Sequence, residues 1–363
     1  TIFARRRHKS SGSLDMSSGH HHTKSDWRRV ARRVLIRGAI GIVLLGCLGT
    51  AWNFLAVRHD RSANPPPGHI YTINGYAMHM YCTGSGSPTL VLESGHGEDF
   101  TVWGKVQPSL SKVTHTCSYD RAGFGWSATQ PGELDADHVA DRLHSLLLSA
   151  GITTPIILEG HSAGGLYARV YASKFPKDVA GVVLVDATSP IPLPQPSFSK
   201  ALDHHSEAEF VFVKAAVGLG IARLMGQCDS VPDGLEAYAR WIKASACYYP
   251  QLDAYAREDR ALDNSRTQGA STGPFGELPI LILSQDPKKQ IPSFLKNRVS
   301  SNDWALSTAA HDKDQAAYLQ LSTRSQRVIA TGSGHYIQYD RPDVVIQETT
   351  KFIEQIRKTG ASF

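Results

Sequence analysis

Residues 155–171 read Pro-Ile-Ile-Leu-Glu-Gly-His-Ser-Ala-Gly-Gly-Leu-Tyr-Ala-Arg-Val-Tyr, and this stretch decides the fold. Its apolar start is typical of a buried strand, and its end is typical of a helix. Between them, Gly160-His161-Ser162-Ala163-Gly164 matches the pattern Gly-x-Ser-x-Gly. In this context the two glycines let strand and helix approach through a tight turn, which lifts the serine hydroxyl above the edge of the sheet. The stretch therefore predicts an α/β fold with Ser162 as a nucleophile.

A nucleophilic serine needs a histidine base, which in this kind of fold comes last in the chain, after the acid. His335 lies in a glycine-bracketed loop after the apolar run 327–330 and before a helix that we expect to open near Pro342. Such a loop can reach the serine, so we expect His335 to be the base. The side chain of His161 should point away from that of Ser162, and we expect it to pack or to support the site.

Two aspartates compete for the acid that orients the histidine. Asp286 follows the apolar run 278–283, which is the usual place for this carboxylate, but its short loop lacks the glycine often found before it. Asp186 ends the run 182–185 and could act from a neighbouring position, or could merely cap a loop. We expect Asp286 to be the acid. Asp186 is the first alternative, and Asp312 is the second.

Acyl transfer also needs donors aimed at the oxyanion that forms in the transition state. One should be the backbone N–H of Ala163, directly after the nucleophile. The other should come from the loop Ser94-Gly95-His96-Gly97, which follows the apolar run 89–93. We assign it to the N–H of His96; alternatively, the glycines of this loop only make a turn.

Taken together, these motifs resemble the α/β-hydrolase superfamily in its single-domain serine-hydrolase branch. The resemblance covers residues 70–356 and includes Asp120-Arg121-Ala122-Gly123-Phe124-Gly125-Trp126-Ser127, a stretch specific to the superfamily. It implies an α/β-hydrolase fold: an eight-stranded, mostly parallel sheet flanked by helices, with an inserted helical cap and no cofactor. A serine at position 162 argues against epoxide hydrolases and haloalkane dehalogenases, which use an aspartate there. Ser94 departs from the family pattern, where many relatives have histidine.

Strand patterns recur along the chain and alternate with helix patterns, as in a parallel sheet. We expect a hairpin over 69–82 and the helix 134–147. Further strands are expected at 89–93, 114–119, 156–160, 180–186, 279–284 and 326–330. The core then comprises 69–187 and 278–363. Residues 188–277 break the rhythm and should form the cap, with helices near 208–225 and 235–246. Aromatic residues that could line its pocket or pack it on the core are Phe198, Phe210, Phe212, Trp241, Tyr248 and Tyr249.

The N-terminal region differs from the rest in charge and hydropathy. The chain has 363 residues and a net charge of +5, yet residues 1–37 hold ten Lys or Arg and two acidic residues, which leaves −3 for the remainder. The basic character therefore belongs to a polar tail, 1–37, which we expect to be disordered. Nothing in the body suggests nucleic-acid binding. Residues 38–57 carry no charge and are long enough to span a bilayer. Residues 58–68 end in a proline-rich linker.

Arginines are concentrated before this apolar segment, which by the positive-inside rule places the tail in the cytoplasm and the remaining domain outside it. We expect an uncleaved signal anchor. A cleaved signal peptide or a lipobox at Cys47 are the alternatives. Outside the cytoplasm disulfides can form, and the candidates are Cys82 with Cys117 and Cys228 with Cys247, against reduced thiols. No cysteine has zinc-ligand spacing, and we expect no metal.

The sequence thus predicts a membrane-anchored serine hydrolase that cleaves a carboxylic ester or related acyl substrate. A peptidase similar to prolyl aminopeptidases is the alternative activity, because Glu207, Glu209 and Glu236 in the cap could hold an amino group. A non-catalytic binding protein with the same fold is the other alternative, but the intact pair of Ser162 and His335 argues against it.

Overall fold

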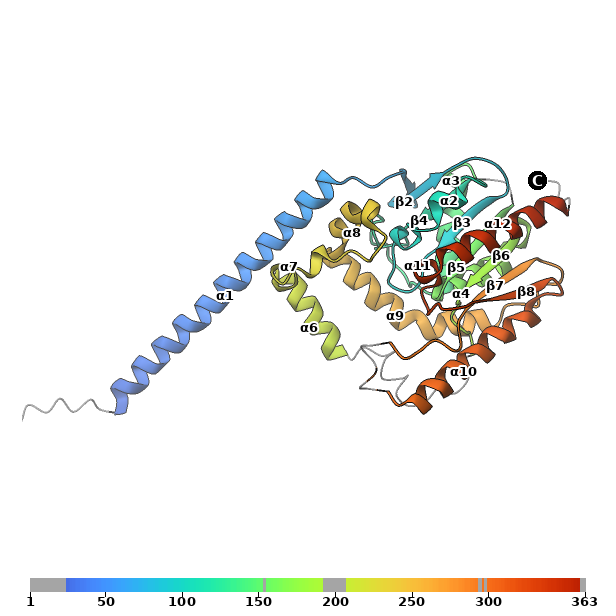
Figure 1. Ribbon diagram of the computed structural model, residues 1–363. Helices are drawn as coiled ribbons and strands as arrows, with labels where there is room; N and C mark the ends of the chain where they lie inside the picture. The colour runs from blue at the N-terminus through green and yellow to red at the C-terminus, as the bar shows by residue number, and fades with distance from the viewer. Residues whose placement is uncertain (1–23, 153–154, 192–206, 293–295, 297–298, 360–363) are drawn as a thin grey trace, which may run out of the picture. The chain divides into compact units, whose positions relative to one another are not determined.

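The computed structural model describes residues 24–359 except 153–154, 192–206, 293–295 and 297–298 (Figure 1). The chain divides into two compact units, Thr1–Leu48 and Gly49–Phe363. The first is described from Lys24 on and consists of the N-terminal part of helix α1. The second contains the end of α1, the sheet and all other described helices.

An eight-stranded sheet forms the centre of the second unit, with the strand order β1-β2-β4-β3-β5-β6-β7-β8. The hairpin pairs antiparallel, β2 pairs antiparallel with β4, and every later pair is parallel. The predicted fold class is thereby confirmed. The strands are β1 His69–Ile73, β2 Tyr76–Thr83, β3 Thr89–Glu93, β4 Thr116–Tyr119, β5 Ile156–His161, β6 Val179–Val185, β7 Ile280–Gln285 and β8 Ser325–Ala330.

Both faces of the sheet are covered, and for this reason β3 and β5 are buried along their whole length. Helices α3 and α4 contribute to one apolar cluster, and α2 and α12 contribute to a second one. These helices are α2 Gln107–Leu110, α3 Ala136–Ser149, α4 Ala163–Lys174 and α12 Pro342–Lys358; α10 Ser301–Ala317 and α11 Ile337–Asp340 complete the C-terminal part.

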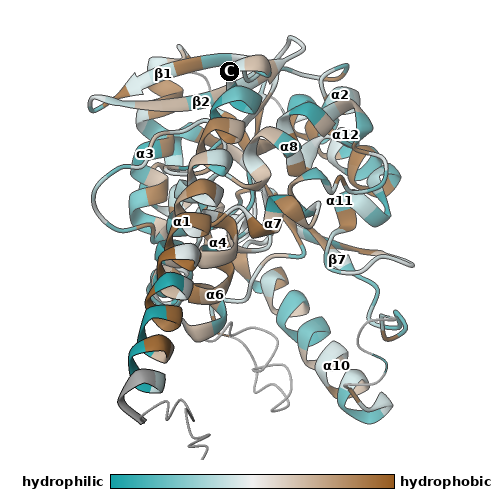
Figure 2. Ribbon diagram, turned by 90° about the vertical axis from the view of Figure 1, so that its left-hand side faces the viewer, coloured by the Kyte–Doolittle hydropathy of each residue, from teal (hydrophilic) through white to brown (hydrophobic). Residues whose placement is uncertain are grey.

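Helix α1 spans Lys24–Ala63 and is longer at both ends than the predicted apolar segment 38–57. Residues 24–37 of the predicted disordered tail are helical, and so are the first residues of the predicted linker. Nothing in the sequence breaks the helix before Pro65, since arginine, alanine and leucine are good helix formers. In the part of the chain that the structure describes, Trp27–Ala63 is the helix whose length and composition would allow it to cross a membrane. Its apolar residues are visible in Figure 2.

The cap contains α6 Glu207–Gly218, α7 Ile221–Leu224, α8 Ala239–Ala246 and α9 Tyr249–Ala270. Helices α6 and α7 fall in the stretch expected near 208–225, and α8 falls in that near 235–246. The long α9 was not anticipated, because its composition is polar and its apolar positions are few. Phe198 lies outside the described residues. Trp241 is buried against Phe100 of the core, while Phe212 is 73% exposed.

Both candidate disulfides are present in the structure, in place of reduced thiols. Cys82 and Cys117 are paired residues of β2 and β4, and their sulfurs are bonded. Cys228 and Cys247 join the segment before α8 to its C-terminal end within the cap. Cys47, in α1, is free and exposed.

Candidate active site

Ser162 lies on the turn between β5 and α4 and is the N-cap residue of that helix. Its backbone has φ 52° and ψ −122°, a region that side-chain-bearing residues rarely occupy and that marks stored strain. The turn needs the glycines around it: a Cβ on Gly160 would collide with the backbone of Gly164, and one on Gly164 would collide with the backbone of Glu93. The predicted elbow is therefore built as the sequence suggested.

The loop after β8 brings His335 to this serine. The Ser162 hydroxyl and His335 Nε2 are 3.0 Å apart, and His335 Nδ1 is 2.7 Å from Oδ2 of Asp186. Asp186 directly follows β6 and is fully buried, whereas the side chain of His335 is 43% exposed. The three side chains thus form a hydrogen-bonded chain from a buried carboxylate to an accessible hydroxyl. Thr188 Oγ1 lies 3.3 Å from the serine oxygen and was not anticipated.

Asp186 binds a second imidazole, which the sequence did not reveal. His311, on α10, places Nε2 at 2.9 Å from Oδ1 of Asp186, and the backbone N–H of Gln285 donates to the same oxygen. Burial alone would raise the pKa of Asp186, but His311 and His335 outweigh it and hold the pKa well below the usual range. For His311, burial opposes the charge, yet Asp186 raises its pKa above the ordinary value. The carboxylate therefore stays ionised at any pH near neutrality.

The first choice for the acid, Asp286, does not contact His335 in the part of the chain that the structure describes. Its two oxygens accept backbone N–H groups from Lys288 and Gly332, each at 2.8 Å. This carboxylate ties the loop after β7 to the loop that carries His335. The order of preference from the sequence is corrected: Asp186 meets the histidine, because β6 delivers its carboxylate beneath the imidazole. Asp312 instead pairs with Arg327.

The loop after β3 is held from two sides. Arg121 donates to the carbonyl oxygens of Ser94 and Gly95, both at 2.6 Å. The guanidinium is itself fixed by Glu258 of cap helix α9, whose other oxygen accepts the N–H of Gly97 at 2.7 Å. The superfamily stretch thus supplies an arginine that shapes the candidate oxyanion loop, a role the sequence did not indicate.

Within this loop the backbone donors are not equivalent. The N–H of Gly95 donates to Glu98 at 2.6 Å, and that of Gly97 is bound by Glu258. Among the described residues no acceptor binds the N–H of His96. Ala163 is the first residue of α4, so its N–H has no intrahelical partner either. The two donors expected for the oxyanion are therefore the ones left available.

His161 supports the histidine loop, as expected. It is buried, and its Nε2 is 3.1 Å from the carbonyl oxygen of His335. Its other ring nitrogen, Nδ1, is 3.1 Å from Oε2 of Glu98. The carboxylate of Glu98 therefore connects Gly95, in the oxyanion loop, with the loop of the candidate base.

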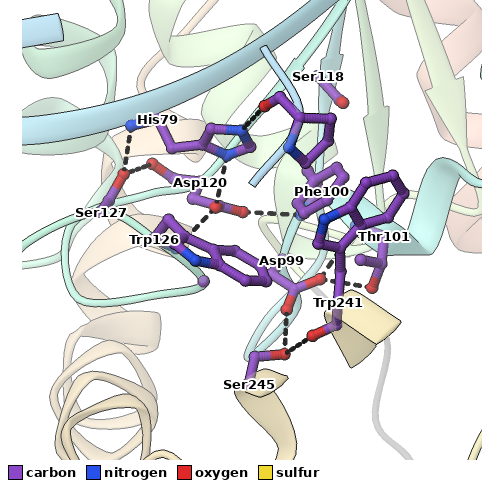
Figure 3. A network of polar contacts seen from close by, with 12 residues as sticks. His79, Asp99, Phe100, Thr101, Ser118, Asp120, Trp126, Ser127, Trp241 and Ser245 are labelled. Atoms are coloured by element: carbon purple, nitrogen blue, oxygen red, sulfur yellow. Dashed lines mark hydrogen bonds and ion pairs between the residues drawn. The ribbon is translucent and has the colours of Figure 1, made fainter. Parts of the chain in front are cut away.

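A buried polar network connects the core to the cap close to this site (Figure 3). Asp120 accepts the N–H groups of Phe100 and Trp126 and pairs with His79 at 2.7 Å. Nearby, Oδ2 of Asp99 accepts the hydroxyl of Ser245, on cap helix α8, at 3.1 Å. Burial, reinforced by the charge of Asp120, raises the pKa of Asp99 to about 6.

Metal-ligating residues come together at one place in the described chain. Cys82, His115 and Cys117 lie within ligand distance of one another. The two cysteines are joined in a disulfide, so they offer no thiolates to a metal.

The comparisons with known proteins agree with this architecture. A family model described as the alpha/beta hydrolase family matches residues 85–348, well over half of the chain. The chain therefore belongs to the alpha/beta hydrolase family.

Curated relatives share part of the sequence. An uncharacterized protein of Schizosaccharomyces pombe is 30% identical over 193 residues, which cover 45% of this chain and 36% of that protein. Lipase 3 of a Moraxella species is 28% identical over 169 residues, which cover 43% of this chain and 52% of the lipase. The chain spans roughly a third to a half of the length of the curated relatives that it matches.

Two solved structures resemble the whole fold. A putative lipase from Acinetobacter baumannii has a TM-score of 0.58 at 18% identity, covering 85% of this chain and 97% of its own. A membrane phospholipase A, described as a bacterial virulence factor, has a TM-score of 0.60 at 19% identity, covering 91% and 99%. At these identities the similarity shows the fold alone.

Proposed function

We propose that this protein is a serine hydrolase that cleaves carboxylic esters through an acyl-enzyme intermediate. The observation that carries the proposal is the chain of hydrogen bonds from Asp186 through His335 to Ser162 on a strained elbow. Nucleophile, base and orienting carboxylate in this order are what acyl transfer requires.

In the first step, Nε2 of His335 takes the proton of Ser162 as the serine oxygen attacks the ester carbonyl. Asp186 remains ionised, fixes the tautomer of the imidazole and stabilises the imidazolium that forms. The tetrahedral oxyanion rests on the backbone N–H groups of His96 and Ala163, which have no other acceptor among the described residues. The His335 imidazolium then donates its proton to the alcohol oxygen of the ester, and the alcohol leaves as the acyl-enzyme forms. Water, deprotonated by the same histidine, attacks the acyl carbonyl, and the protonated histidine returns its proton to Ser162 as the carboxylic acid leaves.

The substrate class is inferred from a named relative. Lipase 3 of a Moraxella species carries a lipase name, which favours an acyl ester over a peptide. The apolar helix Trp27–Ala63 supports attachment to a membrane. Five of its arginines precede the apolar segment 38–57, whereas only Arg58 and Arg61 follow it. This asymmetry favours a cytoplasmic N-terminus and a catalytic domain on the other side.

The test is turnover of p-nitrophenyl esters from acetate to palmitate by the full chain in detergent, with L-proline p-nitroanilide alongside. Ester turnover should fall by several orders of magnitude in Ser162→Ala, to what the oxyanion donors and binding still supply. The chain length at the optimum sizes the acyl pocket.

Other outcomes identify the alternatives. Anilide cleavage without ester cleavage would replace the esterase proposal with a peptidase. A folded protein that turns over no substrate and takes up no fluorophosphonate at Ser162 would support a non-catalytic binding protein.

A further inference from the structure

A large apolar cavity lies between the C-terminal end of α1 and the cap, away from the serine. Its volume is about 1140 Å³, at the upper end of ordinary ligand pockets. None of Ser162, His335 and Asp186 lines it. Its walls are formed by Thr50, Asn53, Phe54, Val57, Arg58, Arg61, Val211, Lys214, Ala215, Gly218, Leu219, Cys247, Tyr248, Tyr249 and Pro250.

The walls are held together by hydrogen bonds, an ion pair and a disulfide. Asn53 of α1 donates to the carbonyl oxygen of Val217 at 3.0 Å. Arg223, on α7, binds both Asn53 and Asp60 of α1, the latter at 2.9 Å. The disulfide to Cys228 fixes Cys247, which lines the cavity. Because these bonds connect the segments that line it, the cavity is formed without a ligand.

Among the described residues, the charges that line the cavity are all positive. Arg58, Arg61 and Lys214 line it, and no described Asp or Glu does. Lys214 is already paired with Asp253, outside the lining. An apolar space bordered only by cations is complementary to a molecule with a hydrocarbon chain and a negative head.

Arg61 is the cation best placed for that head. Its guanidinium lies 4.0 Å from the ring centre of Tyr248 and 5.0 Å from that of Trp126. One terminal nitrogen, Nη1, is buried and has no hydrogen-bond partner. Asp99 and Asp120 are close enough to interact with it electrostatically, but in the described chain neither forms an ion pair with it. An unpaired buried guanidinium donor is costly unless something binds it.

We propose that this cavity is a second binding site, which takes an anionic lipid. The acyl chain lies against Phe54, Val57 and Val211, and a carboxylate or phosphate accepts hydrogen bonds from Arg61. Helix α6, which lines the cavity through Lys214, also carries Phe210, one turn away. The ring of Phe210 stacks on Tyr255, which in turn packs on His96. Helix α6 therefore connects the cavity with the candidate oxyanion loop through aromatic contacts.

The proposal is tested by photolabelling of the full chain in nanodiscs, with no measurement of catalysis. Three probes carry the same diazirine acyl chain: a free fatty acid, a phosphatidylglycerol and a phosphatidylcholine. Peptide mapping should find the label on α6 and on the segment that contains Phe54 and Arg61. Ala215→Trp, which fills the cavity, should reduce that label at least tenfold.

Arg61→Gln should reduce anionic labelling about tenfold, as expected for the loss of one charge-assisted hydrogen bond. Arg240→Gln is the matched control, because Arg240 also stacks on an aromatic ring, at 4.1 Å from that of Trp241, but does not line the cavity. Thermal melting followed by circular dichroism verifies that each variant is folded.

The three probes distinguish the source of the lipid. Labelling by the fatty acid alone identifies a free acid as the occupant, and labelling by phosphatidylglycerol alone identifies a membrane lipid. Equal labelling by phosphatidylcholine, or label spread along α1 and unchanged by Ala215→Trp, would overturn the proposal.

Discussion

Strands β6 and β7 are neighbours in the sheet, and each is followed directly by an aspartate. The carboxylates of these two aspartates nevertheless bind different partners. Asp186 is fully buried and faces the imidazoles of His335 and His311. Asp286 is partly exposed, and its oxygens accept backbone N–H groups, which lower its pKa below the usual value. Equivalent positions at neighbouring strand ends therefore do not identify the candidate acid. In the described chain the two aspartates differ in that Asp186 contacts the imidazole of His335 and Asp286 does not.

The largest expected effect is a difference in activity between variants of these two aspartates. Asp186→Asn should lower kcat for the best ester substrate by about 10⁴-fold, because a neutral amide leaves the imidazole in the wrong tautomer. Asp286→Asn is the matched control at the next strand end and should change kcat by less than about threefold, within the range of a surface substitution. Steady-state kinetics on both variants measures the difference. Comparable losses in the two variants would mean that the acid has been misassigned.

The contrast also shows how far the sequence could lead. The elbow at Ser162 was predictable from its glycine spacing and His335 from its place in the chain order, whereas the sheet of eight strands was implied by the resemblance to the α/β-hydrolase superfamily. The disulfides were among the candidate pairs, because Cys82 and Cys117 fall in strands that should be neighbours in this fold and Cys228 and Cys247 fall in the same inserted segment.

What the sequence could not supply depends on geometry between distant segments. The choice between Asp186 and Asp286 turned on where two short loops meet, and His311 reaches the site from a helix 125 residues away. Likewise, Arg121 and Glu258 meet under the oxyanion loop from segments 137 residues apart. The cap helix α9 was missed because its polar composition hides its buried face.

A third aspartate, the buried Asp99, extends the comparison to stability. In the described chain its carboxylate is hydrogen-bonded to no imidazole, and burial together with Asp120 raises its pKa to about 6. An unfolded aspartate has a pKa of about 3.9, so the folded state binds the extra proton between these values and stability falls as pH rises through about 4 to 6. Asp99→Asn keeps the acceptor for the N–H of Thr101 and removes the charge.

This variant should be more stable than the parent above pH 6, by on the order of 2 kcal/mol, and equal to it below about pH 4. Urea unfolding at pH 4 and pH 8 provides the measurement. A loss of stability of the same size at both pH values would show that Asp99 acts as a hydrogen-bond partner whose ionisation is immaterial.

The imidazole of His311 shares Asp186 with that of His335, so it should affect the pH dependence of catalysis. While protonated, it offsets the charge of Asp186 and so weakens the stabilisation of the His335 imidazolium. His311→Gln keeps a donor for Asp186 but is always neutral, so the acid limb of the pH profile of kcat/KM should move to higher pH by up to about one unit. His144→Gln is the control, since His144 also pairs with an aspartate, Asp178 at 3.0 Å, on α3 away from the site. If the acid limb were unchanged and kcat/KM fell by the same factor at every pH, the role of His311 would be structural.

The smallest effect concerns the stability contribution of Asp286. Its carboxylate caps the N–H groups of Lys288 and Gly332 and so joins the loop after β7 to the loop of His335. Because the site is partly exposed, water can replace much of what Asp286→Asn or Asp286→Ala removes, and the expected loss is less than about 1 kcal/mol. Asn retains an acceptor, so it should cost less than Ala in thermal melting. An increase in KM for Asp286→Ala with kcat unchanged would show that these two hydrogen bonds hold the loop of His335 in the position that substrate binding requires.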